Sequence, residues 1–223
     1  MGFARGPNIV TDGLVLALDA ASSRSYPGSG DTIYDLAGSN NGTLTNGPTF
    51  DSGNGGSIEF NGTDDYIDTN YPLNGSNAFS VSCWFNLDRV DKTWQSVVDA
   101  YLSSSDRNFQ LWVNNNAKLY VFHLGSNHTG AGELSPNVWY NAVFTYEGSG
   151  NGVLYLNGEV LEASVPKGAG SGGNVNVDIA RRTDAHASSY TDGNISTVKI
   201  YDGALTSTEV TQNYNALKSR FGL

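Results

Sequence analysis

The 223-residue sequence contains little cysteine, few charged residues and no long apolar run. Its one cysteine, Cys83, cannot form a disulfide within the chain. No stretch approaches the roughly 20 apolar residues of a membrane-spanning helix, and residues 1–8 lack the apolar segment of a secretory signal. We therefore expect a domain that folds without disulfide bridges and without a secretory leader.

Basic residues are also scarce. The chain has 12 Lys and Arg against 22 Asp and Glu, which gives a formal net charge of -10 at pH 7. Because phosphate groups are bound by a basic field, this balance argues against a nucleic-acid-binding surface. The simplest interpretation of the acidity is solubility, and the sharper alternative is cation binding.

Glycine and aromatic residues are abundant, with 27 Gly, 12 Tyr and 9 Phe. This composition is typical of an all-β, turn-rich protein, and the length suits one large sandwich that buries its own core. The sequence shows neither an internal repeat nor an interdomain linker. We therefore predict one domain over residues 13–223, preceded by an extended N-terminal arm over residues 1–12, where Pro7 argues against a helix.

Apolar stretches of strand length recur along the chain. Residues 79–87 alternate so that the odd positions face the core and Trp84 faces the opposite side. Asn61-Gly62 and Asn157-Gly158 each predict a hairpin. Residues 20–48 read as a long excursion with a short strand-like piece at 32–36. The predicted strands are 14–19, 57–60, 66–68, 79–87, 96–101, 109–113, 118–122, 139–146, 153–156, 159–161, 175–179 and 195–201.

One helix is predicted at the C-terminus. Thr206 and Glu209 have the spacing of a capping box, in which each side chain binds the backbone amide of the other residue. The apolar positions after it repeat at spacings of four, three and four, and Gly222 ends the pattern. We expect these positions to pack on a sheet: Val210, Tyr214, Leu217 and Phe221.

The motifs resemble, in order and spacing, those of laminin-G-like domains of the concanavalin A type. The similar segments are Gly13–Asp19, Asp35–Leu44, Ile58–Ile67, Phe79–Phe85, Leu154–Gly158 and the closing phrase Asp192–Val210. The resemblance implies an all-β jelly-roll sandwich of two antiparallel sheets with one C-terminal helix. The sequence is particularly similar to laminin-G-like virion proteins of tailed bacteriophages of marine or cyanobacterial hosts.

Catalysis is not expected. Glycan hydrolases on this fold resemble one another in a strand bearing Glu-x-Asp-x-x-Glu, because acid–base hydrolysis needs paired carboxylates at a fixed distance. The sequence contains no such strand, its glutamates are scattered, and its 3 histidines stand apart from any nucleophile motif. We therefore predict a protein that is not an enzyme, with no catalytic residues.

The resemblance also implies a structural calcium ion, held by carboxylates and carbonyls from the first strand and the last turn. By position, Asp19 and Asp192 match best, and Asp64 and Asp65 match less well. The alternative is that these aspartates shape turns, since an Asp side chain caps its local backbone.

Carbohydrate binding is the third possibility, because lectins stack an aromatic ring on a sugar and hold its hydroxyl groups with polar side chains. The candidate ligand-binding residues are Trp84, Trp112, Arg107, Asn127 and His128. Trp94, Tyr101 and Trp139 are further candidates for the same concave sheet, and Asn108, Arg181, Arg182 and His186 for its loops. The alternative is that the aromatics pack under loops or at subunit contacts, and that Arg181-Arg182 only balances charge.

The N-terminal arm carries Phe3, Arg5 and Ile9, a combination suited to docking onto a partner. A disordered terminus is the alternative.

The leading hypothesis is a virion surface protein of a tailed phage, a capsid decoration or a tail- or fibre-associated module. It would be made in the host cytoplasm, form a homo-oligomer, contact other virion proteins through the arm, and adhere to host-surface glycans. The alternatives are a calcium-assisted lectin not tied to a virion and, third, a glycan hydrolase.

Overall fold

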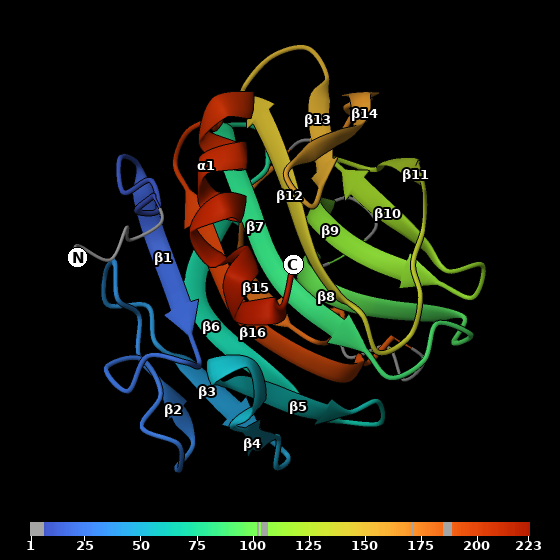
Figure 1. Ribbon diagram of the computed structural model, residues 1–223. Coiled ribbons are helices and arrows are strands. Elements are labelled where there is room, and N and C mark those ends of the chain that lie inside the picture. The colour runs from blue at the N-terminus through green and yellow to red at the C-terminus, as the bar shows by residue number, and fades with distance from the viewer. Residues whose placement is uncertain (1–6, 102, 104–106, 171, 185–188) are drawn as a thin grey trace.

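Two antiparallel β-sheets packed face to face make up the protein, with one α-helix on the outer side of the first sheet (Figure 1). The computed structural model describes residues 7–101, 103, 107–170, 172–184 and 189–223. In spatial order the first sheet contains β14 (Glu159–Val165), β13 (Gly152–Leu156), β12 (Trp139–Glu147), β7 (Ala78–Leu87), β16 (Asp192–Tyr201), β5 (Ser57–Asn61) and β4 (Thr49–Asp51), and β1 (Leu14–Asp19) also pairs with β16.

The second sheet is formed by the remaining strands. In order they are β11 (Ser126–Glu133), β10 (Lys118–His123), β9 (Arg107–Asn114), β8 (Trp94–Tyr101), β15 (Asn174–Ile179), β6 (Tyr66–Asn74), β3 (Gly42–Thr45) and β2 (Thr32–Ile33). This architecture confirms the predicted all-β sandwich with a C-terminal helix. In the described part of the chain, no helix has the length and apolar character needed to cross a membrane.

The core lies between the two sheets and follows the predicted alternation. The odd positions of β7, from Phe79 to Leu87, are buried against apolar side chains of β9 such as Phe109. His123 is buried among the same rings, and its Nε2 lies 2.8 Å from the Gly75 carbonyl oxygen. Burial lowers the pKa of His123 to about 4, so the imidazole is neutral at physiological pH and serves the core.

Of the two predicted hairpins, one is confirmed and one is wrong. Asn157 and Gly158 join β13 to β14 with φ angles of 52° and 82°, the left-handed conformation that a tight hairpin turn requires. Asn61-Gly62 instead carries the chain from the first sheet to the second, because β5 pairs with β16 whereas β6 pairs with β15. The Asn61 side-chain oxygen accepts the Thr63 amide at 2.8 Å, so the motif forms a turn without pairing its flanking strands.

Three strands were not predicted. The largest, β11, begins with polar residues and contains Gly130 and Gly132, so it shows no apolar alternation. It pairs only with β10, at the edge of the second sheet. Strands β3 and β4 lie within or beside the predicted excursion over residues 20–48 and are 4 and 3 residues long. Strands of three or four residues are too short for a period to be recognised.

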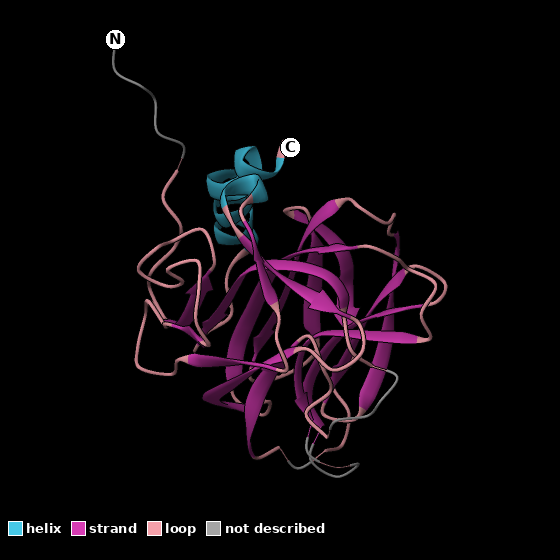
Figure 2. Ribbon diagram, turned by 90° about the horizontal axis from the view of Figure 1, so that it is seen from below, coloured by secondary structure: helices cyan, strands magenta, loops and turns pink. Residues whose placement is uncertain are grey.

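The C-terminal helix begins and ends as predicted. In α1 (Ser207–Leu217) the Glu209 amide donates to Thr206 Oγ1 at 3.3 Å, and the Thr206 amide donates to Glu209 Oε2 at 2.8 Å. The short 3-10 helix η2 (Lys218–Phe221) follows, and Gly222, with a φ of 75°, ends it in the left-handed conformation. Figure 2 shows the helix outside the layers of strands.

Trp84 lies beneath this C-terminal segment. Its ring stacks on Phe221 with centroids 4.2 Å apart and on Tyr214 at 5.6 Å, and Trp139 lies 4.6 Å from Phe221. Trp84 is only 1% exposed. Its predicted position opposite the core residues is therefore correct. Its predicted role in ligand binding is wrong, because the ring packs under the helix.

The beginning of the described chain also binds the helix. The Val10 amide donates to Asn213 Oδ1 at 2.7 Å, and the Val10 carbonyl accepts the Tyr201 hydroxyl at 3.1 Å. Gln212 Nε2 donates to the Asn8 carbonyl at 2.8 Å. Residues 8–10, which include the predicted docking residue Ile9, thus lie along the chain's own helix. Phe3 and Arg5, the other two predicted docking residues, lie outside the described residues.

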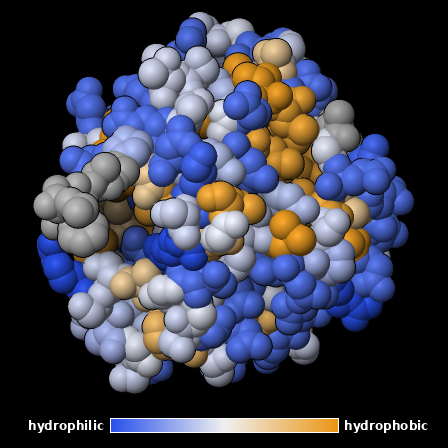
Figure 3. Space-filling model, in the orientation of Figure 1, coloured by the Kyte–Doolittle hydropathy of each residue, from blue (hydrophilic) through white to orange (hydrophobic). Residues whose placement is uncertain are grey.

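The face that carries α1 also shows an apolar stripe over the region of β12–β14 (Figure 3). Val160 of β14, with 51% of its surface exposed, is the most exposed large apolar side chain of the described chain. Single exposed valines are ordinary on soluble proteins, so the stripe assigns no role to this face.

Replacing Phe221 tests the contact between the helix and the sheet. Phe221→Ala removes a ring that stacks on Trp84 and Trp139, and we expect the free energy of unfolding to fall by about 3 kcal/mol. Urea unfolding followed by tryptophan fluorescence measures this change. The control is Leu223→Ala, because that side chain is 47% exposed and should cost under about 0.5 kcal/mol. Equal stability of the two variants would contradict the packing described here.

Candidate functional site

Five polar and aromatic side chains cross the outer face of the second sheet in one row. The successive register partners are Asp68 on β6, Asp178 on β15, Asp99 on β8, Gln110 on β9 and Phe122 on β10. Directly paired residues of neighbouring strands project from the same face of a sheet. The row therefore places three carboxylates side by side on the face opposite the core.

Asp99 is the buried centre of this row. Its Oδ2 accepts hydrogen bonds from Gln110 Nε2 at 2.6 Å, Trp112 Nε1 at 2.9 Å and Ser96 Oγ at 3.2 Å. Its Oδ1 accepts from the Thr183 hydroxyl at 3.1 Å and the Thr183 amide at 3.2 Å. Burial raises the pKa of Asp99 to about 6 although these donors oppose the shift, so the carboxylate is mostly ionised at pH 7.

Above Asp99 lies a group of rings and guanidinium groups that we call the aromatic–arginine cluster. The Arg107 guanidinium carbon is 5.2 Å from the Tyr101 ring centre and 5.8 Å from that of Phe122. The Arg182 guanidinium carbon is 4.8 Å from the same Tyr101 ring and 5.9 Å from that of Trp112. Trp112 and Phe122 are 5.4 Å apart, which closes the circle. The cluster consists of Tyr101, Arg107, Trp112, Phe122 and Arg182.

Beside the cluster is an open hollow of about 350 Å³, which we call the polar groove. In its wall, Arg181 Nε donates to Asp178 Oδ2 at 2.6 Å, and the guanidinium carbon lies 3.4 Å from the centre of the Tyr66 ring. Burial raises the pKa of Asp178, and Arg181 opposes this shift. The groove is lined by Asp68, Asn174, Val175, Asn176, Asp178, Arg181 and Thr183.

The cluster and the groove share one segment of chain. Arg181 faces the groove, Arg182 lies over the rings, and Thr183 lines the groove while it donates to Asp99. The register pair of Asp178 and Asp99 joins the two regions through the sheet itself. Together they form one surface, which we call the open face.

Residues 61–211 match the sequence pattern of a laminin G family described as the Concanavalin A-like lectin/glucanases superfamily. The chain belongs to this superfamily. The match covers most of the two sheets, including every residue of the aromatic–arginine cluster and of the polar groove. The comparison with curated protein sequences found no match.

Solved structures share the fold at low identity. The sialidase of Trypanosoma rangeli, in complex with 2,3-difluorosialic acid as a covalent intermediate, superimposes with a TM-score of 0.75 and 17% identity. That superposition covers 96% of this chain and 35% of the sialidase chain. The binding domain of botulinum neurotoxin serotype D gives a TM-score of 0.70 and 15% identity, covering 92% of this chain and 52% of that one. The chain thus spans about a third of the sialidases, and these likenesses show the fold alone.

The structure brings some of the predicted ligand-binding residues of this superfamily member together and separates others. Trp112 and Arg107 both belong to the aromatic–arginine cluster, and Trp94 lies next to them, 5.3 Å from Trp112. His128 lies elsewhere, with its Nε2 3.1 Å from Glu162 Oε2 of the first sheet. Asn127 is on β11, and its side chain lies outside the described residues.

Four further candidates have mixed outcomes. Tyr101 lies in the cluster as expected, whereas Trp139 packs against Phe221 with Trp84 on the other sheet. Asn108 is fully buried and donates to the Leu73 carbonyl at 2.8 Å, so it serves the fold. His186 lies outside the described residues.

Sequence reasoning missed Asp68, Asp99 and Asp178 because they come from three separate strands. Each lies next to a core residue in a strand that was at least partly predicted, so strand alternation places each carboxylate on the outer face. Only the register of the sheet shows that they are neighbours. The sequence therefore indicates which face of its strand each aspartate occupies, but it does not indicate that the three aspartates lie side by side.

The two aspartates expected to share a calcium ion do not share a site. Asp19 pairs with Thr197 of β16, and Asp192 lies at the start of that strand, roughly 16 Å away at about 3.3 Å per residue. In the described part of the chain, no three His, Cys, Asp or Glu side chains are grouped so that they could hold a metal ion. The predicted pair therefore does not fit a joint calcium site.

Asp19 is paired with a cation from the chain itself, and Asp192 acts electrostatically on another. Arg220 Nη1 donates to Asp19 Oδ1 at 2.9 Å, and the same guanidinium donates to the carbonyls of Asn54 and Gly56, both at 2.8 Å. Asp192 acts on the partly buried ammonium of Lys92, where it opposes the lowering of the pKa that burial causes. Arg220 thus binds the mixture of carboxylate and carbonyl oxygens that calcium prefers.

The weaker metal candidates shape a turn. Asp64 Oδ1 accepts from Asn61 Nδ2 at 2.9 Å, and Asp65 Oδ2 accepts the Asn61 amide at 3.1 Å. These bonds are those of a local turn, in line with the alternative interpretation.

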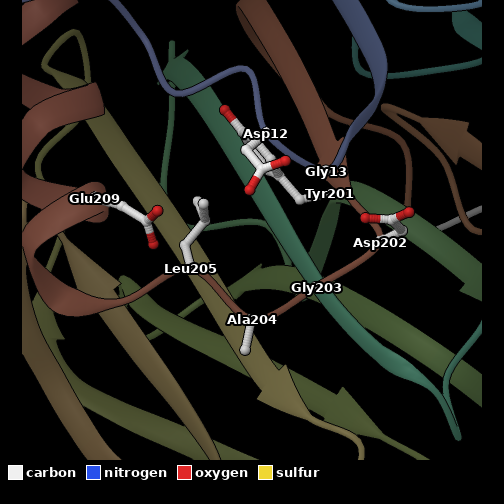
Figure 4. A pocket seen from close by; sticks show the side chains of 8 residues that line it. All are labelled: Asp12, Gly13, Tyr201, Asp202, Gly203, Ala204, Leu205 and Glu209. Carbon is white, nitrogen blue, oxygen red and sulfur yellow. The ribbon is translucent and has the colours of Figure 1, made fainter.

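A second acidic hollow lies on the helix side of the molecule. It has a volume of about 200 Å³ and is lined by Asp12, Asp202, Glu209 and the segment between β16 and α1. Figure 4 shows Glu209 and Asp202 on opposite sides of this hollow. Glu209 already accepts two hydrogen bonds from Thr206 at the helix cap. We therefore place the functional site on the open face.

The raised pKa of Asp99 predicts a pH dependence of stability. Because the folded state binds this proton more tightly than the unfolded chain, the contribution of Asp99 to the free energy of unfolding is full below about pH 4 and falls as the pH rises to 6. Relative to Asp99→Asn, the wild type should lose about 3 kcal/mol across this window, at about 1.4 kcal/mol per pKa unit. Urea unfolding at several pH values measures the stability of both proteins, and a wild type that gains stability relative to Asp99→Asn as the pH rises would contradict the buried carboxylate.

Arg220 is expected to act as the internal cation of the Asp19 site. Arg220→Ala leaves the Asp19 carboxylate and two carbonyls without this donor, and we expect a loss of about 2 kcal/mol of unfolding free energy. Arg220→Lys, which keeps the charge, should lose less. The wild-type melting temperature should not change between calcium and chelator. A fall of several degrees on chelation would show that calcium stabilises the fold after all.

Proposed function

We propose that this domain binds a glycan on the open face of its second sheet. The observation that carries the proposal is the polar groove, which lies directly beside the aromatic–arginine cluster. Sugar rings present hydroxyl groups at their edges and apolar C–H faces, so a sugar site needs polar side chains next to exposed aromatic rings. The open face has the polar side chains of the groove, and the rings of Phe122, Trp94 and Tyr120 on and beside it are partly exposed.

The groove supplies the polar part. Asp68, Asn174 and Asn176 are exposed and line it, while Arg181 is held in place by Asp178. A carboxylate accepts hydrogen bonds from hydroxyl groups, and an amide both donates and accepts. Because Asn174 and Asn176 are two residues apart on one strand, they project to the same side at a separation of about 7 Å. They can therefore bind separate hydroxyl groups of one chain.

The aromatic part is extended by Trp94 and Tyr120. Their ring centres are 5.3 Å apart with the planes nearly perpendicular, and both rings are partly exposed. Trp112 is held from below by its hydrogen bond to Asp99 and from the side by Trp94. Trp112 is itself only 5% exposed, so it supports the ring of Trp94, and the partly exposed rings of Trp94 and Tyr120 offer the stacking surface.

The same geometry supports glycan hydrolysis less well than it supports glycan binding. The carboxylates of Asp99 and Asp178 are of the right type for acid–base work, and neighbouring strands are about 4.8 Å apart. However, both are buried and engaged: Asp99 holds Trp112, and Asp178 holds Arg181. The arrangement supports their use in positioning the binding residues.

The virion role is a separate proposal. A phage particle component that is docked through residues 1–12, that assembles as a homo-oligomer and that adheres to host-surface glycans would use the open face for adhesion. The resemblance of the sequence to laminin-G-like phage proteins motivates this proposal. Immunogold labelling of phage particles with an antibody to the domain tests it, and labelling confined to unassembled protein would contradict it.

A glycan array followed by calorimetry tests the binding proposal. Asn176→Ala and Trp94→Ala should each weaken binding of a selected glycan about tenfold, because one loses a polar contact and the other a stacking ring. Glu159→Gln on β14 of the first sheet is the control and should bind like the wild type.

The result against the proposal is equally clear. If the folded wild type binds no glycan on the array, or if both variants bind like the wild type, the open face is not a glycan site. Release of reducing ends from a bound polysaccharide, lost in Asp178→Asn, would instead show the hydrolase alternative.

A further inference from the structure

Among the described residues, Arg107 is the arginine of the open face that has no carboxylate partner. Arg181 pairs with Asp178, and Arg182 pairs with Asp184. Elsewhere, Arg89 pairs with Asp91 and Arg220 with Asp19. Among the described residues no Asp or Glu forms an ion pair with Arg107, although the chain has almost twice as many acidic as basic residues.

The lack of an ion pair matters for Arg107 because of where its side chain lies. The side chain is partly buried, and its Nε–H is shielded from solvent without donating a hydrogen bond to any described residue. A shielded donor of a charged group is costly to leave unmatched. The exposed Arg24 also has no ion pair among the described residues, but water solvates an exposed guanidinium.

The surrounding rings hold the guanidinium without neutralising it. Arg107 lies over Tyr101 and Phe122, and Arg182 lies over the same Tyr101 ring. Aromatic faces attract a cation but accept no strong hydrogen bond, so these rings leave the hydrogen-bonding capacity of the Arg107 guanidinium unmatched. Asp99 adds a negative charge below the cluster, but its oxygens are occupied by neutral donors, namely Gln110, Trp112, Ser96 and Thr183.

From this geometry we infer that the glycan bound on the open face is acidic, and that Arg107 binds its oxyanion, a carboxylate or a sulfate. This inference rests on the proposed glycan binding and names the chemical class of the ligand. A planar guanidinium matches a carboxylate or sulfate with two parallel hydrogen bonds. The adjacent polar groove would then take the hydroxyl groups of the neighbouring sugar.

The net charge of -10 limits the kind of acidic ligand. A nucleic acid has a phosphate at every residue and would be repelled by the acidic surface, whereas one oxyanion paired with the Arg107 guanidinium is attracted at short range. The ligand class is therefore a sugar with a local acidic group on an otherwise hydroxylated chain.

The test uses pairs of glycans that differ only in the acidic group. The probes are oligogalacturonate with its methyl ester, and a sulfated oligosaccharide with its desulfated form, together with neutral oligosaccharides of the same length. We expect the wild-type protein to bind the acidic member of one pair at least tenfold more tightly than its neutralised partner. Which pair responds distinguishes a carboxylate from a sulfate.

The variants assign the effect to Arg107. Arg107→Gln should remove the preference for the acidic member, and Arg107→Lys should retain part of it because the charge remains. Arg24→Gln is the matched control, since it removes the same charge from an exposed arginine without an ion pair among the described residues. Circular dichroism melting shows whether each variant is folded, and the paired glycans on the wild type test the inference even if Arg107→Gln does not fold.

Two results would overturn the inference in different ways. Equal binding of acidic and neutral members, weakened by Trp94→Ala, would overturn the acidic ligand and keep the proposed glycan binding. No binding of any probe by the folded wild type would overturn both.

Discussion

The stacking of Trp84 on Phe221 is the contact on which the arrangement of this molecule depends. It fastens the C-terminal helix to the outer face of the first sheet, where Trp139 and Tyr214 complete the layer. Apolar rings on the outer side of a sheet must be covered, because exposing them to water costs roughly 25 cal/mol per Å². Once the helix covers this face, the second sheet is the one whose outer side is free for a ligand.

On that second sheet, buried Asp99 organises the surface above it. Its carboxylate orients the indole of Trp112 and the amide of Gln110, and it anchors Thr183 next to Arg182. Burying a charge is costly unless hydrogen bonds satisfy it, and here five hydrogen bonds do so. These hydrogen bonds fix the side chains that surround Asp99. A shallow binding surface needs this rigidity to keep its aromatic rings and guanidinium groups in place.

At the rim of the sandwich, Arg220 occupies the position that the family resemblance assigned to calcium around Asp19. A guanidinium offers fixed N–H donors to the same oxygen atoms that a cation would coordinate. Both solutions neutralise a carboxylate and tie separate loops together. In this chain the tie runs from the C-terminal 3-10 helix to the first strand, so the end of the chain reinforces its beginning.

The sequence alone determined most of the strands, the core side of β7, the Asn157-Gly158 hairpin and the capped helix, because each is decided by residues near one another in the chain. It also named Arg107 and Trp112 as candidates, and the structure places both in the aromatic–arginine cluster. Only the tertiary structure decided that Trp84 is covered, that Asn61-Gly62 crosses between sheets, and that Asp68, Asp178 and Asp99 stand in one row. These depend on which strands pair, and pairing is set by packing between distant segments, such as those that carry Asp68 and Asp178, 110 residues apart, which no local pattern encodes.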